Sequence, residues 1–182
     1  MGGNCAYGGV KYTSASGVEY VCNGAPGTAG PVGPPGASGS VMAFGFFYAL
    51  MPPDNASTIA AAGAVVFPRD GAATGIIRAN GTDFLLPAIG VYEVSWQVSV
   101  DEPGQLVLAI DSGSGAVEQP STLAGRATGT SQISNHVLIT TTAANSVLSL
   151  RNPAGNSPAL TVTPLAGGTH AVAASLLIKR VQ

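Results

Sequence analysis

Hydrophobic and polar positions alternate along much of the chain, most regularly over Gly90–Val100. Neighbouring side chains of a β-strand point to opposite faces of the sheet, so strict alternation predicts a strand with one buried face. The residues on the apolar side are Tyr92, Val94, Trp96, Val98 and Val100, and those on the polar side are Glu93, Ser95, Gln97 and Ser99. We therefore expect a half-buried strand over Gly90–Val100.

Shorter apolar runs separated by turn residues predict further strands, and no segment has a convincing helical period. These strands are expected at Met42–Leu50, Ala64–Phe67, Asp83–Leu86, Gln105–Asp111, Gln132–Thr142, Ser146–Arg151, Ala159–Pro164 and Ala171–Val181. Many short strands with regular turns are typical of a β-sandwich or jelly roll. Residues 41–182 are accordingly predicted to form one all-β head.

The first and last of these strands are apolar on both alternations, as is usual for strands covered on both faces. We expect them to lie side by side, with one face toward the core. In a trimeric head, the other face would meet the three-fold axis. The candidates for the trimer core or interface are Phe44, Phe46, Tyr48, Leu176 and Ile178.

A strict three-residue repeat precedes the head. Glycine recurs at every third position of residues 24–40, with Pro26, Pro31, Pro34 and Pro35 between the glycines. A collagen triple helix needs this pattern, because only glycine fits at the axis of three wound chains. The alternative is a flexible Gly/Pro-rich linker. The expected axis glycines are Gly24, Gly27, Gly30, Gly33, Gly36 and Gly39.

Residues 1–23 contain both cysteines of the chain, Cys5 and Cys22. They flank two short apolar runs around Ser14–Gly17, which predict a small β-hairpin. A segment of this size cannot bury a core, so a Cys5–Cys22 disulfide would help to stabilise it in an oxidising compartment. Two free thiols in an unstructured leader are the alternative. Two cysteines without a nearby histidine are too few ligands for a zinc site.

Composition favours an oligomer. Of the 182 residues 46% are hydrophobic and 9% are charged, against roughly 25% charged in a typical domain. A membrane protein would explain this balance, but the longest apolar run, Met42–Met51, is about half of the ~20 residues that a spanning helix needs. The first residues also lack the layout of a secretion signal. Burial of surface between subunits remains as the explanation.

Catalytic and nucleic-acid-binding patterns are absent from the sequence. The seven lysines and arginines are scattered, whereas phosphate binding needs clustered cations. Neither His136 nor His170 has a carboxylate or cysteine at relay or ligand spacing, and no loop has the dense oxygen ligands of a strong calcium site. We therefore expect no enzyme, no catalytic residues, no cofactor and no bound metal.

Several segments of the head resemble the C-terminal domain of the BclA family, the collagen-like glycoproteins of the bacterial spore exosporium. In chain order they are Ala49–Asn55, Ile89–Tyr92, Pro103–Leu108, Gly125–Gln132, Leu138–Leu148, Arg151–Asn156 and Leu160–Thr169. The resemblance implies a jelly roll of the tumour-necrosis-factor/C1q (TNF/C1q) type, assembled as a trimer on a collagen-like filament. It also implies glycans on threonines of the triplets, where this chain has only Thr28.

These expectations define three segments: residues 1–23 with the cysteines, the collagen-like stalk 24–40, and the jelly-roll head 41–182. The expected function is a structural one, the trimeric tip of a filament on a spore surface, which nucleates the triple helix and sets its register. The alternative is an adhesin or receptor-binding head on a cell, spore or phage virion. Its partner would be a host receptor, a cell-surface receptor or a glycan.

Overall fold

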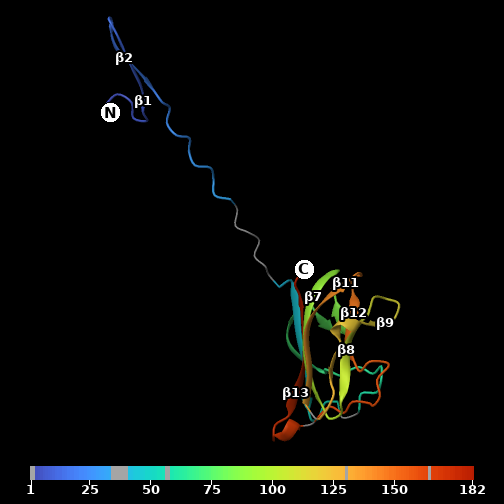
Figure 1. The fold of residues 1–182 in the computed structure, drawn as a ribbon. Coiled ribbons are helices and arrows are strands. Elements are labelled where there is room, and N and C mark those ends of the chain that lie inside the picture. Colours follow the sequence, from blue (N-terminus) through green and yellow to red (C-terminus); the bar gives the residue numbers. More distant parts are fainter. Residues whose placement is uncertain (1–2, 34–40, 56–57, 130, 164) are drawn as a thin grey trace. The chain divides into compact units, whose positions relative to one another are not determined.

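The computed structural model describes residues 3–33, 41–55, 58–129, 131–163 and 165–182 (Figure 1). The chain divides into two compact units, Met1–Ser38 and Gly39–Gln182. The expected axis glycines Gly36 and Gly39 lie outside the described residues, as does the expected boundary between stalk and head.

The first unit contains a two-stranded antiparallel hairpin of β1 (Gly9–Ser14) and β2 (Gly17–Cys22). A disulfide joins Cys5 to Cys22. Every residue of the two strands is exposed. Residues 23–33 have no regular secondary structure and are exposed throughout.

The second unit is a sandwich of two sheets in which all strand pairs are antiparallel. The first sheet has the order β11 (Ser131–Thr141), β7 (Gly90–Val100), β13 (Val172–Arg180), β3 (Ala43–Met51) and β4 (Arg69–Thr74). The second has the order β10 (Ala124–Arg126), β8 (Gly104–Asp111), β12 (Ser146–Arg151), β6 (Phe84–Leu86) and β5 (Ile77–Arg78), and β9 (Ala116–Glu118) pairs with β8.

The described residues contain no α-helix, only two 3₁₀ turns at Pro120–Thr122 and Leu165–Gly167. The prediction of an all-β head is therefore confirmed. Within the described part of the chain, no helix is long and apolar enough to cross a bilayer.

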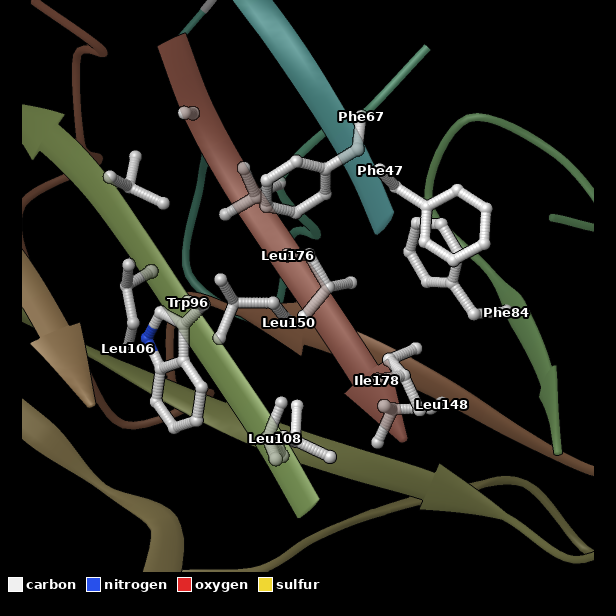
Figure 2. Close-up of a cluster of buried hydrophobic side chains, with 14 of the residues drawn as sticks. Phe47, Phe67, Phe84, Trp96, Leu106, Leu108, Leu148, Leu150, Leu176 and Ile178 are labelled. Atoms are coloured by element: carbon white, nitrogen blue, oxygen red, sulfur yellow. The ribbon is translucent and has the colours of Figure 1, made fainter. Parts of the chain in front are cut away.

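The core lies between the two sheets and is built from the inward side of each alternating strand (Figure 2). The rings of Phe47 and Phe84 pack with centroids 4.5 Å apart, and Phe67 meets Phe84 edge-on. Leu176 and Ile178 of β13 are 0% exposed. Full burial of such a side chain contributes about 1.5–3 kcal/mol, so this layer is the main source of stability in the head.

The predicted strands are largely confirmed. Gly90–Val100 and Ser146–Arg151 have the expected bounds, and the first and last strands of the head pair along their length. Two predictions were wrong. Residues 64–67 and 159–163 form only isolated bridges, and Pro164 lies outside the described residues.

Backbone hydrogen bonds explain the first of these differences. Val65 donates its N–H to Leu150, Phe67 donates to Gly81, and Val66 donates to the side chain of Asn55. Successive residues therefore bond to three different segments, and no continuous ladder forms although Val65 and Phe67 are buried.

Candidate assembly surface

The outward side of the five-stranded sheet has a regular distribution of residue types. The register places His136, Ser95, Leu177 and Phe46 in one row across β11, β7, β13 and β3. The neighbouring rows are Leu138, Glu93, Lys179 and Phe44 on one side and Ser134, Gln97, Ser175 and Tyr48 on the other. Each row begins with polar or mixed residues on β11 and β7 and ends with an aromatic side chain on β3.

The aromatic half of this face is only partly covered. Phe46 is 37% exposed, and its ring stacks on that of Tyr48 with centroids 5.9 Å apart. Phe44 and Tyr48 are half-buried. Three outward aromatic side chains on one strand form an apolar surface that favours association over contact with water.

The polar half contains a small hydrogen-bonded group. Ser95 Oγ lies 2.7 Å from His136 Nδ1, and Lys179 Nζ donates to Glu93 Oε1 at 2.8 Å. His136 Nε2 is 3.9 Å from the same oxygen of Glu93. The hydrogen bond from Lys179 lowers the pKa of Glu93, while partial burial acts in the opposite direction. The charges of Glu93 and Lys179 are therefore paired within the face, and the face is close to neutral.

The structure divides the five trimer candidates between two surfaces. Leu176 and Ile178 pack into the head's own core, whereas Phe44, Phe46 and Tyr48 lie on the outward face. Sequence alone missed the outward Leu177 as a separate candidate, although its position between Leu176 and Ile178 was a sufficient signal.

The first four glycines of the three-residue repeat lie where a single chain would accept other residues. A Cβ added at Gly24, Gly27, Gly30 or Gly33 would meet no atom within 4 Å. None of these four glycines has a positive φ. Within the described part of one chain, neither space nor backbone conformation therefore requires glycine at these positions. Thr28, between two of them, is exposed.

The described residues contain no group of three or more His, Cys, Asp or Glu side chains arranged to hold a metal ion. His136 is largely exposed and bonds Ser95, and His170 is exposed in the loop before β13.

A shallow hollow of about 630 Å³ lies where β8 begins and β10 ends, lined in part by Gln105, Arg126 and Asn156. Arg126 Nη2 donates to the carbonyl oxygens of Val100 and Glu102. Its Nε and Nη1 are buried without a hydrogen-bond partner. Buried donors without acceptors are uncommon in proteins, and a bound water or ion is one explanation for them.

The two antiparallel sheets, their strand order and the pairing of the first and last strands define a TNF/C1q-like jelly roll. Solved structures with this fold match the chain. The globular domain of zebrafish complement 1qA matches with a TM-score of 0.52 and 12% identity, over 76% of this chain and 96% of that one.

Two further structures agree. Murine APRIL matches with a TM-score of 0.53 and 12% identity, over 75% of this chain and 98% of the other. Eiger TNF from S. frugiperda matches with a TM-score of 0.57 and 10% identity, over 79% of this chain and 94% of the other. At these identities the likeness establishes the fold. No protein family and no curated protein matches the sequence.

Proposed function

We propose that this protein is a non-enzymatic, homotrimeric surface protein, in which the jelly-roll head forms the tip of a collagen-like filament and brings three chains together in register. The observation that carries the proposal is the set of glycines at 24, 27, 30 and 33, which nothing in the described residues of one chain requires. Three chains wound around a common axis would require every one of them.

The outward face of the five-stranded sheet is the proposed trimer interface. Phe44, Phe46 and Tyr48 provide an apolar half, and the Glu93–Lys179 pair leaves little net charge to oppose contact. Five triplets are too short to hold three chains together unaided, so the head would raise their effective concentration and fix their order. The stalk would then form as a consequence of head assembly.

The proposed location is an extracellular surface, a spore exosporium or appendage of the BclA type, with a virion fibre as the other setting. The resemblance of the head segments to that family and the adjoining glycine triplets support this proposal. Thr28 is the only threonine of the triplets, and its exposed side chain is the proposed glycan site.

Light scattering of the full chain tests the proposal directly. We expect a mass of three 18.0 kDa chains, together with a collagen-type circular dichroism maximum that disappears when the head is prevented from trimerising. A monodisperse monomer would overturn it. A trimer without that maximum would overturn the part that concerns the stalk.

The second candidate function is an adhesin or receptor-binding head, and the hollow beside Arg126 favours it. Arg126 lines this hollow, and a guanidinium group binds ligands that present acceptor oxygens, such as a glycan. A glycan array probed with the full chain and with Arg126→Met tests this candidate. Binding that is lost in the variant supports it, and no binding at high micromolar concentration excludes it.

A further inference from the structure

The two faces of the N-terminal hairpin carry opposite charges. In the register of β1 and β2, Lys11 lies opposite Tyr20, and Tyr12 lies opposite Glu19. Paired residues share a face and successive residues alternate. Lys11, Thr13, Val18 and Tyr20 therefore form one face, and Val10, Tyr12, Glu19 and Val21 form the other. We call these the Lys11 face and the Glu19 face.

Each face carries one charge among mainly apolar side chains, and the described residues of the chain cover neither face. Val10, Tyr12, Val18, Tyr20 and Val21 are all exposed. A two-stranded hairpin alone is marginally stable in water, and the disulfide supplies a covalent link but no buried area. Exposed aromatic and β-branched side chains on both sides of a small sheet are typical of surfaces that another protein covers.

The chain itself indicates what covers them. Gly24, the first glycine of the three-residue repeat, follows the end of β2 at Cys22 by two residues. If three chains begin a triple helix at Gly24, their three hairpins must lie close together, because each hairpin ends only two residues before the helix. Because the two faces differ in charge, the Lys11 face of one copy suits the Glu19 face of the next copy. Such a head-to-tail contact closes into a ring when the rotation between copies allows it.

We propose that the disulfide-closed hairpins of three chains pack in a ring, with the Lys11 face of each hairpin against the Glu19 face of the next. The hairpin is thus a second trimerisation unit, placed at the start of the repeat, and its partners are two further copies of this chain. The inference rests on the proposed trimer and adds to it an interchain Lys11–Glu19 contact.

The disulfide has a definite role in this arrangement. Cys22 lies in register with Gly9 at the end of the Lys11 face. A Cβ at position 9 would be 3.0 Å from Cys5 Sγ and 2.3 Å from the carbonyl oxygen of Val21, so glycine is required there. The bond ties the segment before β1 to the last residue of β2, immediately ahead of the repeat, and keeps that end of the hairpin closed.

Zero-length carbodiimide cross-linking of the full chain, followed by denaturing electrophoresis and mass spectrometry, tests the contact. We expect covalently linked dimers and trimers that contain a Lys11–Glu19 isopeptide bond. This bond should be lost in both Lys11→Gln and Glu19→Gln. A Lys11–Glu19 bond found only in chains of monomer mass, or no such bond in a protein that is trimeric by light scattering, would overturn the inference.

Charge exchange provides a second test that does not depend on the reagent. Lys11→Glu and Glu19→Lys should each lower the melting temperature of the collagen-type circular dichroism signal, and the double exchange should restore it. Ala15→Glu, in the turn between the strands, is the control for added charge and should leave the melting temperature unchanged. Equal melting in all four variants would refute the ring.

The outcomes for the two proposals differ. If the unmodified protein has a monomer mass, both proposals fail together. If the head trimerises and the hairpins do not associate, the mass remains that of a trimer, no Lys11–Glu19 bond forms, and only the ring is excluded.

Discussion

Gly71 lies directly against Phe46: a Cβ at position 71 would be 2.5 Å from Cδ1 of the Phe46 ring and 3.2 Å from the Phe46 carbonyl oxygen. Here β4 pairs with β3, and the register of the pair shifts between Gly45 and Phe47. The absence of a side chain on β4 allows the aromatic ring of β3 to keep its outward position at the edge of the proposed interface.

Gly71→Ala should therefore displace Phe46 or the edge strand β4. Overpacking of this kind typically costs about 1–3 kcal/mol, and a half-exposed ring that can move should put the cost at the lower end. We expect weaker trimer association with a small loss in thermal stability, measured by sedimentation equilibrium and calorimetry. Ala72→Ser, at the next position of the same strand, is the control. A variant that trimerises normally would show that Phe46 need not keep its position.

The outward face should tolerate charge poorly. Phe46→Asp places a carboxylate in the aromatic half of that face and should convert the trimer to monomers, because an unpaired charge in an interface is costly. Ile77→Asp is the matched control, since Ile77 is 59% exposed on β5 of the other sheet. Light scattering of the two variants measures the outcome: we expect a monomer mass for Phe46→Asp and a trimer mass for Ile77→Asp. Trimers in both variants would place the interface elsewhere.

Leu176 and Leu177 are neighbours in sequence and should behave differently. Leu176→Ala removes a fully buried side chain and should lower the free energy of unfolding by about 2–5 kcal/mol. Leu177→Ala acts on the outward face and should change the stability of the isolated head by about 0.5 kcal/mol or less while weakening assembly. Denaturant unfolding, measured at protein concentrations below and above the one at which the trimer dissociates, separates the two effects. Equal losses in both variants would contradict the assignment of faces.

The turn after β3 should make the head sensitive to acid. Asp54 accepts hydrogen bonds from Arg69 Nε at 2.6 Å and from the N–H of Leu50 at 2.8 Å. The hydrogen bond from Arg69 lowers the pKa of Asp54 below its ordinary value of 3.8, although burial acts to raise it. A carboxyl group whose pKa is lower in the folded state contributes stability above its unfolded pKa, and this contribution is lost as the pH falls through the folded value.

Asp54→Asn should consequently be less stable than the unmodified head at neutral pH, and the difference should shrink as the pH falls below about 4. Thermal unfolding at a series of pH values measures this. Arg69→Gln should show the same trend, because it removes the other partner of the pair. A constant difference across the series would mean that the pair does not contribute to the pH dependence.

Reduction should affect the hairpin and leave the head intact. Replacement of Cys5 and Cys22 by serine opens a covalent loop of 17-residue separation, a change that typically costs about 3 kcal/mol. We expect faster amide exchange in β1 and β2 and an unchanged melting temperature of the head, because both cysteines belong to the first unit. A shift in head melting would instead indicate that the units are coupled.

Alternation of apolar and polar residues predicted the strands that bury one side. It failed where residues are buried but do not pair with a neighbouring strand. Gly90–Val100 was predicted at its observed bounds because its apolar side is buried while Glu93, Ser95 and Gln97 remain partly exposed. Ser99, expected on the polar side, is also buried. Residues 64–67 are equally apolar, and Val65 and Phe67 are buried, but their backbone bonds go to different segments. Sequence pattern reports burial, whereas a strand also needs a partner of matching direction.

Edge strands were missed for the converse reason. β4, with the sequence RDGAAT, has small and polar side chains and no apolar alternation. β4 is a strand because it pairs with β3, and its own sequence gives no signal of this pairing. The outward candidates Phe44, Phe46 and Tyr48 were available from sequence, but their separation from Leu176 and Ile178 required the register of β3 and β13.

The pairing of β3 with β13 also determines how the head would respond to force. The head's first strand begins at Ala43, so tension carried along the preceding residues enters the head there. The pairs run from Ala43 with Arg180 to Met51 with Val172. A pull on Ala43 against an anchor at the opposite end of the head would load these backbone hydrogen bonds together, in shear, and would not open them one at a time. The strand pairing would then make the head resistant to unfolding under tension.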